Sequence, residues 1–224
     1  MAGFIPLGDA SRRPRQFALV TTLIILLNVY VFFKELQHGN AFVWTWSAVP
    51  IRIVYGHHWI TLLTSMFMHA GWMHIIGNMV YLWAFGREME DAMGSGRFLF
   101  FYLIGGVVAM MAQILGDPFS RIPALGASGA IAAVMGAFLI TFPRDRIRTF
   151  VFIFIFYIRI TFIPAVFLIG FWFLLQVLDF GSVAQVKTGG VAYLAHIGGF
   201  LFGVVTARLF VNQRRIGYSR MESF

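Results

Sequence analysis

The sequence LGASGAIAAVMGAF (residues 125–138) consists of small and apolar residues and contains a single hydroxyl group, on Ser128. Gly126 and Gly129 lie on either side of this serine. Small residues of this kind are typical of a helix that packs closely inside a membrane. Ser128 can therefore be a packing residue or a nucleophile, and the rest of the chain decides between the two.

The composition indicates a membrane protein with several spans in one domain. Of its 224 residues, 59% are hydrophobic and 12% are charged, whereas soluble proteins contain roughly 25% charged residues. The mean hydropathy is +0.80, and the apolar residues form blocks near the ~20 residues that cross a bilayer. There is no cysteine, which excludes disulfides and thiolate chemistry. The net charge of +8 fits membrane topology better than nucleic-acid binding, and no cofactor is expected.

Hydropathy predicts an all-α bundle of six spans, placed between a tail at 1–16 and a tail at 211–224. Residues 1–16 lack the apolar core of a signal peptide, so the first span is expected to be retained. The connection over 34–71 is rich in tryptophan and is expected to lie in the membrane interface. The predicted spans are Phe17–Phe33, Trp72–Phe85, Phe98–Leu115, Gly126–Phe142, Phe162–Leu178 and Val191–Leu209.

The segment RTFVFIFIFYIRITFIP (148–164) permits two interpretations. Arg159 and Pro164 interrupt its apolar character, which favours an interfacial, extended segment before the fifth span. The alternative is a seventh helix.

Arginine and lysine positions predict the orientation of the chain. Thirteen of the 17 fall in the two termini and in the turns after spans two and four, and four fall on the opposite side. Because cytoplasmic segments carry the excess of basic residues, both termini are expected to be cytoplasmic. A plasma membrane of the bacterial type is the expected location.

Four polar residues stand out within the predicted spans, where polar side chains are costly and usually functional. They are His74, Asn78, Ser128 and His196. All Asp and Glu residues lie in tails, turns or span ends, and no HExxH zinc motif is present, so no metal site is expected. Counted from the first arginine on the cytoplasmic side, Ser128, His74 and His196 lie ~24, ~20 and ~18 Å away at ~1.5 Å per residue. Their similar depth indicates a single site.

Two stripes of small residues suggest how the site is assembled. Gly129, Ala133 and Ala137 recur every four residues in the fourth span. Gly199, Gly203 and Ala207 do so in the sixth. Because such stripes let helix backbones approach closely, the fourth and sixth spans are expected to touch.

The residue types indicate acyl-transfer chemistry. A serine needs a base to remove its proton, and His196 is the candidate. A Ser–His dyad is favoured over a triad, although Asp117, Asp179 and Glu35 stay open as groups that orient His196. His74, Asn78 and the Ser128 N–H are candidate donors to the oxyanion. Each residue alone also has a structural explanation, since serines pack helices and histidines are common at span ends.

Three motifs resemble the rhomboid family of intramembrane serine proteases. GASG (126–129) matches the GxSG nucleophile motif, and HAGWMHIIGN (69–78) contains the HxxxN pattern. AHIGGFLFG (195–203) matches AHxxGxxxG. The resemblance implies Ser128 as nucleophile and His196 as base.

The resemblance also implies the oxyanion hole, the substrate and a gate. The hole would comprise His74, Asn78 and the Ser128 N–H, with Gly126 lining it. Single-span membrane proteins would be cleaved near their extracytoplasmic ends. They would pass the fifth span at GFWFLL (170–175), where Phe171 and Trp172 are the candidate gate residues.

The chain departs from the family pattern at two places. Ile60-Thr61 replaces the common Trp-Arg pair of the first outer loop, and Ala132 replaces a tyrosine that stacks on the catalytic histidine in some members. The second change leaves open how His196 is held. A catalytically silent relative that binds or escorts membrane clients is the alternative function, and the retained serine and histidine count against it.

Overall fold

Helices form most of the structure, a computed structural model that describes residues 2–153, 157–183 and 192–216. The long helices are α1 (Leu19–Trp46), α4 (Trp72–Met93), α5 (Ser95–Gly116), α6 (Ser128–Thr141), α7 (Ala165–Val183) and α8 (Tyr193–Phe210). Three short helical segments connect α1 to α4: α2 (Pro50–Val54), α3 (Thr61–Thr64) and the 3₁₀ turn η1 (Ser65–Phe67). Three strands complete the fold: β1 (Ala2–Asp9), β2 (Arg146–Ile153) and β3 (Tyr157–Pro164).

Each of the six predicted spans overlaps one long helix, and the mostly helical fold class is confirmed. By length and composition, α1, α5 and α8 are able to cross a membrane. The apolar helix α6 and the apolar part of α7, Ala165–Phe180, are shorter than a typical span. The number of six spans therefore stays a prediction.

Several predicted boundaries were wrong. The first helix continues to Trp46 through a bend at Gly39, whose φ of +62° favours glycine, so about the first third of the predicted interfacial connection belongs to this helix. The second continues to Met93, which places the buried carboxylates of Glu88 and Glu90 inside its last turns. The fifth begins at Ala165 because Phe162–Pro164 belongs to β3. Val191, the predicted start of the sixth span, lies outside the described residues.

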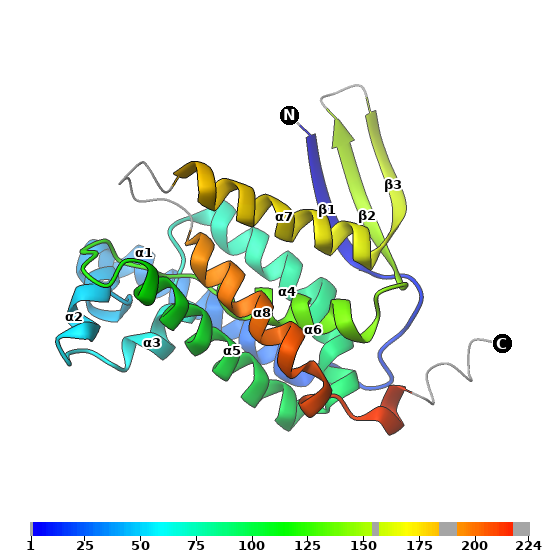
Figure 1. Cartoon of the computed structure of the whole chain (residues 1–224), viewed down its shortest axis with the longest axis horizontal. Coiled ribbons are helices and arrows are strands. Elements are labelled where there is room, and N and C mark those ends of the chain that lie inside the picture. The colour runs from blue at the N-terminus through cyan, green and yellow to red at the C-terminus, as the bar shows by residue number, and fades with distance from the viewer. Residues whose placement is uncertain (1, 154–156, 184–191, 217–224) are drawn as a thin grey trace.

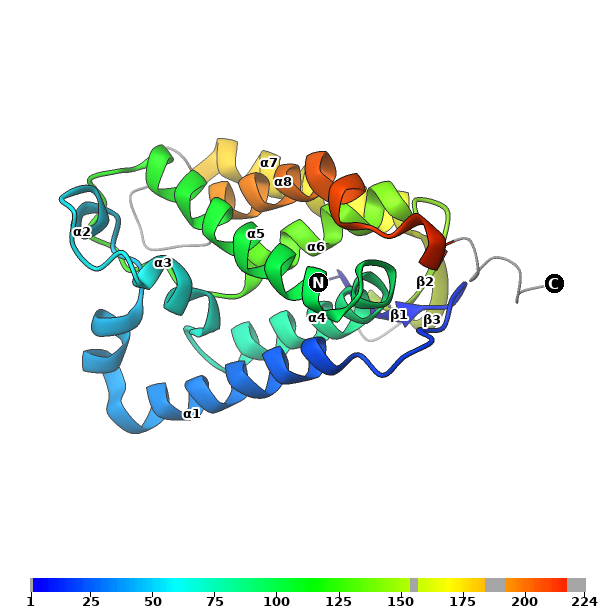
Figure 2. The ribbon, with the colours of Figure 1, turned by 90° about the horizontal axis from the view of Figure 1, so that it is seen from below.

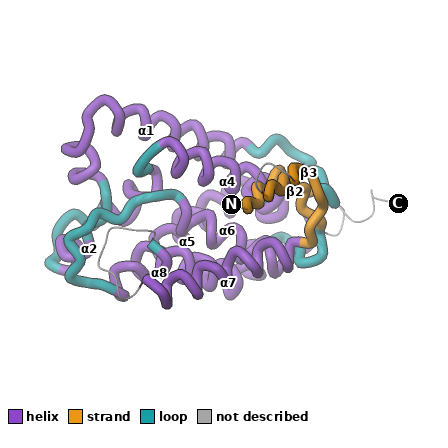
Figure 3. The backbone as a smooth tube through the Cα atoms, turned by 90° about the horizontal axis from the view of Figure 1, so that it is seen from above, coloured by secondary structure: helices purple, strands orange, loops and turns teal. Residues whose placement is uncertain are grey.

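Helix α6 lies at the centre of the bundle. Ten consecutive residues, Gly129–Phe138, are buried. A helix that is apolar on every side has to be surrounded by other elements, and here α4, α5, α7 and α8 surround it. Helices α1 and α7 lie on opposite sides of the bundle with α6 between them (Figure 2 and Figure 3). The nucleophile candidate thus stands at one end of the most enclosed helix.

The packing of α6 on α8 depends on residues without large side chains. A Cβ added to Gly199 would collide with the carbonyl oxygen of Gly129, and one added to Gly203 would collide with that of Ala133. On α6, a Cβ on Gly136 would collide with the carbonyl oxygen of Phe200. Contact between the two backbones fixes the distance between the ends of these helices.

An antiparallel sheet of order β1-β2-β3 adjoins the helices, and Figure 1 shows it projecting beside α7. In the described residues of the segment 148–164, which belong to β2 and β3, the extended interpretation is confirmed and the alternative of a seventh helix is wrong. The predicted tail at 1–16 includes β1, which pairs with β2 from Ala2 to Asp9 with an irregularity between Pro6 and Gly8. Phe4 of β1 packs edge-to-face on Phe171 of α7, with the ring centroids 6.3 Å apart.

Polar contacts close the end of the bundle where α1 begins and α8 ends. The Glu90 carboxylate accepts hydrogen bonds from the backbone N–H groups of Val20 and Thr21, at 2.9 and 2.7 Å. It thereby caps the N-terminus of α1, where a negative charge is favourable. Arg12 forms an ion pair with Asp145 and lies over the ring of Phe142. These contacts attach the N-terminal segment to the helices on either side.

Candidate active site

Ser128 is the first residue of α6, and the loop before it sets its position. Gly126 has φ +130°, a conformation that L side chains rarely adopt, and its N–H donates to the Ser65 carbonyl at 2.9 Å. The N–H groups of the first helical turn have no acceptor within the helix, so this end of α6 favours negative charge. The serine is half-buried and lines a small pocket.

His196 comes from the first turn of α8 and meets Ser128 directly. Its Nε2 lies 2.7 Å from the Ser128 Oγ. The histidine side chain is 8% exposed, so little water competes for this hydrogen bond. The close approach of α6 and α8 brings together two residues that lie 68 positions apart in the sequence.

Gln176 of α7 contacts the other ring nitrogen. The His196 Nδ1 lies 2.7 Å from the Gln176 Oε1, and the Gln176 Nε2 donates to the Trp172 carbonyl at 3.3 Å. The second bond fixes the orientation of the amide, since a flipped amide would place two oxygens against each other. An oxygen facing Nδ1 requires the proton on Nδ1 and leaves Nε2 free to accept from Ser128.

The motif-based reasoning missed Gln176. The open candidates for orienting His196 were carboxylates, whereas the structure places an amide at this nitrogen. Glu35 accepts from the His69 N–H instead, at 3.1 Å from each of its oxygens. Polarity within an apolar span was the available signal, because Gln176 interrupts the run FWFLLQVL (171–178).

His74 and Asn78 lie on α4, one turn apart. The Ala70 N–H donates to the His74 Nδ1 at 3.3 Å, which places the proton on Nε2. A Cβ added to Gly126 would lie 3.0 Å from that Nε2 and 3.5 Å from the Ser128 Oγ. The space between the His74 imidazole and the Ser128 hydroxyl is therefore narrow at this glycine. The His74 Nε2–H is thus a candidate donor beside the Ser128 hydroxyl.

Asn78 places a second candidate donor on α4, one turn after His74. Its side chain is 7% exposed, and its Nδ2 is buried without a hydrogen-bond partner among the described residues. A buried donor without a partner is costly in a resting protein and is common where a ligand or an intermediate will supply the acceptor.

His69, at the start of the same motif, supports the loop before α4. Its ring lies 5.1 Å from that of His74, and its side chain is 3% exposed. Burial, with a smaller contribution from His74, lowers the pKa of His69 to about 3. The ring is therefore neutral at physiological pH and adds no charge beside His74.

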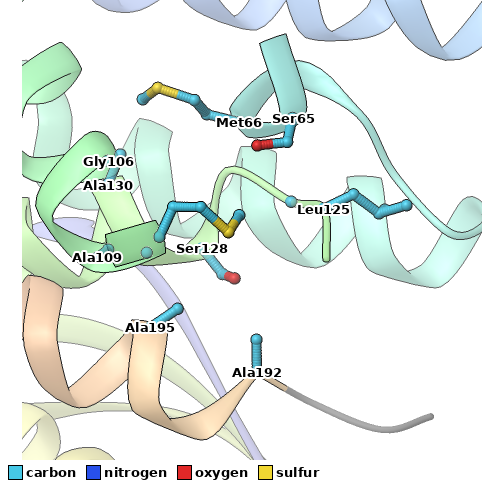
Figure 4. Close-up of a pocket in the computed structure, with 12 residues that line it drawn as sticks. Ser65, Met66, Gly106, Ala109, Leu125, Ser128, Ala130, Ala192 and Ala195 are labelled. Atoms are coloured by element: carbon cyan, nitrogen blue, oxygen red, sulfur yellow. The ribbon is translucent and has the colours of Figure 1, made fainter. Parts of the chain in front are cut away.

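A small pocket opens beside Ser128. Figure 4 shows the Ser128 hydroxyl between Leu125 of the preceding loop and the beginning of α8 at Ala192 and Ala195. The residues that line it are mostly small or apolar. The lining residues are Ser65, Met66, Gly106, Ala109, Met110, Leu125, Gly126, Ser128, Gly129, Ala130, Ala192 and Ala195.

The two gate candidates on α7 differ in their surroundings. The Trp172 ring lies 5.8 Å from the His196 ring and 6.4 Å from that of Phe200. Phe171 is 50% exposed and contacts Phe4 of the sheet. Trp172 thus covers the histidine, while Phe171 points away from it.

Comparison with known proteins places this architecture in a family. The family model for the Rhomboid domain matches residues 56–213. The chain belongs to the rhomboid family. The matched residues include Ser128, His196, His74, Asn78 and Gln176. The family and the apolar helices indicate an integral membrane protein.

Three relatives illustrate the similarity. Rhomboid protease GluP of Bacillus subtilis (strain 168) is 34% identical over 130 residues, or 56% of this chain and 25% of GluP. Rhomboid protein 1, mitochondrial, of Saccharomyces cerevisiae is 30% identical over 152 residues, or 65% of this chain and 40% of that protein. Rhomboid protease GlpG of Salmonella newport is 29% identical over 126 residues, or 56% of this chain and 45% of GlpG. The matched region thus spans less than half the length of these relatives.

Proposed function

We propose that this rhomboid is an intramembrane serine endopeptidase, with Ser128 as nucleophile and His196 as general base. The observation that carries the proposal is the 2.7 Å contact between the Ser128 Oγ and the His196 Nε2. That distance is within the reach required for proton transfer between a nucleophile and its base. The family match and the relatives named rhomboid proteases support the same reaction class.

The reaction would follow the usual course of acyl transfer. His196 Nε2 removes the Ser128 hydroxyl proton while Oγ attacks the scissile carbonyl carbon, giving a tetrahedral intermediate with a negatively charged oxygen. The protonated His196 then gives its proton to the leaving amine as the C–N bond breaks. Water repeats the sequence on the acyl-enzyme, and Ser128 recovers its proton when the carboxylic acid product leaves.

The negative oxygen needs hydrogen-bond donors at a fixed position. His74 Nε2–H and Asn78 Nδ2–H approach from α4, and the Ser128 N–H lies at the free end of α6. Gly126 lies between His74 and Ser128, where a side chain would fill the space. One donor of this kind typically contributes ~10²–10³ to the rate.

The substrates would be single-span membrane proteins, cleaved near their extracytoplasmic ends. The basic residues favour cytoplasmic termini, and α1 begins and α8 ends on the same side of the bundle, the side opposite Ser128. Six spans satisfy this topology, and a plasma membrane of the bacterial type fits it. Phe171 and Trp172 would flank the path of the substrate along α7.

Cleavage of a single-span model protein in detergent micelles tests the proposal. We expect the wild-type chain to release two fragments, and Ser128→Ala and His196→Ala to release none while remaining folded. If the folded wild-type chain cleaves none of several substrates and does not react with a fluorophosphonate, the proposal is refuted and the alternative of a catalytically silent rhomboid is favoured.

A further inference from the structure

Gln176 makes two hydrogen bonds that hold it in one orientation against His196. Its Oε1 accepts from the Nδ1 side of the ring at 2.7 Å, and its Nε2 donates to the Trp172 carbonyl at 3.3 Å. The side chain is 9% exposed. A buried amide with a carbonyl oxygen on one side and an imidazole nitrogen on the other has one satisfactory arrangement.

This arrangement selects the tautomer that the reaction needs. With the proton on Nδ1, the Nε2 lone pair is directed at Ser128. The other tautomer would place a proton on Nε2, where it could not accept from the serine, and would leave two acceptors facing each other at Nδ1. The amide thus acts at the position that a carboxylate occupies in a Ser–His–Asp triad, but it adds no negative charge.

Gln176 also connects the histidine to α7. One face of this helix carries Gln176 and the residues three and four positions before it, Phe173 and Trp172. The Phe173 ring stacks on Phe200 of α8 at 4.2 Å, and the Trp172 ring lies 5.8 Å from His196. The position of α7 against α8 therefore determines whether the Gln176 amide reaches the His196 imidazole.

We propose that Gln176 is a positioning residue that fixes the tautomer and orientation of His196. The ability of His196 to act as a base then depends on how α7 packs against α8. The inference rests on the proposed protease function. It accounts for how His196 is held in a chain with Ala132 in place of the stacking tyrosine. It also assigns α7 a part in the chemistry besides any part in admitting substrate.

Steady-state cleavage by Gln176→Ala and Gln176→Glu tests the positioning role. We expect Gln176→Ala to lower kcat roughly tenfold to a hundredfold with little change in KM, by analogy with the partners that orient metal-binding histidines. Val177→Ala is the matched control, because Val177 is the next residue of α7 and is 41% exposed. It should cleave at the wild-type rate, and melting temperatures of all variants establish that they are folded.

The dependence of kcat on pH distinguishes a positioning role of Gln176 from a packing role. Gln176→Glu keeps the acceptor and should recover most of the rate at high pH. Its acid limb should move to higher pH, because a carboxylate stabilises the protonated imidazolium that cannot act as a base. A wild-type kcat in folded Gln176→Ala would overturn the inference. So would a Gln176→Glu variant as slow as Gln176→Ala over the whole pH range.

A double-mutant cycle tests the dependence on α7. Phe173→Ala removes the ring stacked on Phe200 and should loosen α7. If Phe173 acts through Gln176, its substitution should slow the wild type but have little further effect in Gln176→Ala. If the fold losses in kcat of the two single variants multiply in the double variant, the coupling is contradicted. A wild-type chain that neither cleaves nor reacts with a fluorophosphonate would instead refute the proposed function, so the two failures are distinguishable.

Discussion

His196 is the residue at which three helices meet. Its Nε2 faces Ser128 of α6, its Nδ1 faces Gln176 of α7, and its backbone belongs to α8. Each contact has a separate task in the proposed reaction: the first transfers a proton and the second fixes the tautomer. Small shifts of any of the three helices therefore change the alignment of the base, and misplacement by about 1 Å can cost ~10² in rate.

Asn78 offers a prediction at the level of a single side chain. Asn78→Ala should lower kcat by about 10²-fold, as expected for the loss of one donor to the oxyanion. Stability should change little, because the buried Nδ2 has no partner to lose among the described residues. Cleavage kinetics and a thermal melt in detergent measure both quantities. An unchanged rate would remove Asn78 from the oxyanion hole.

At the scale of the elements, the contact between α6 and α8 sets the distance between Ser128 and His196. The backbones touch where Gly199 meets the Gly129 carbonyl and where Gly203 meets that of Ala133. Gly199 lies one turn from His196, and Gly129 is adjacent to Ser128. A side chain inserted here would separate the two reacting groups as well as the helices.

Gly199→Ala should therefore reduce both stability and activity. Forcing a methyl group into a packed core typically costs about 1–3 kcal/mol, and the neighbouring atom here is backbone, which cannot move aside by a rotamer change. The melting temperature and the fluorophosphonate reaction rate should both fall. Gly170→Ala on α7 is the control, since its Cβ would meet no atom within 4 Å. Equal effects of the two substitutions would refute the packing argument.

At the scale of the whole molecule, the sheet joins the N-terminal segment to the connection between α6 and α7. Strand β1 precedes α1, whereas β2 and β3 connect α6 to α7. Asp9, at the end of β1, has its Oδ1 2.6 Å from the Ser11 N–H, and its Oδ2 is buried without a partner among the described residues. This buried carboxyl makes the junction sensitive to pH.

The stability of the β1–β2 pairing should fall as the pH rises from about 4 to 7. Burial, aided by the nearby Asp145, raises the pKa of Asp9 from 3.8 to about 7. Over that interval the folded chain holds a proton that the unfolded chain has released, so rising pH favours unfolding, and the effect levels off above the folded pKa. Hydrogen exchange of the β1 amides, corrected for intrinsic rates, measures this dependence.

Asp9→Asn provides the matched test of that titration, because an amide of the same shape cannot release the proton. The variant should show flat protection between pH 5 and 8. Protection that falls equally in wild type and variant would assign the pH effect to another group.

Sequence patterns predicted the residues of the dyad but not all of their neighbours. Ser128, His74 and His196 are separated by whole helices, yet their similar depth could be counted from the arginines at the span ends. Gln176 was missed because an amide near a span end resembles a boundary residue, and its role depends on how α7 is rotated. The three-stranded sheet was missed because β1 and β2 are 136 residues apart along the chain, and hydropathy does not report such pairing.

Labelling with a fluorophosphonate, followed by tryptic digestion and mass spectrometry, tests the central claim most directly. Trypsin cleaves after Arg121 and Arg144, and the fragment between them contains two hydroxyl groups, on Ser128 and Thr141. The account predicts a phosphonyl adduct on Ser128 in the wild-type chain, and none in His196→Ala, because the serine then lacks its base. An adduct on another residue, or labelling of Ser128 that is unchanged in His196→Ala, would contradict the account.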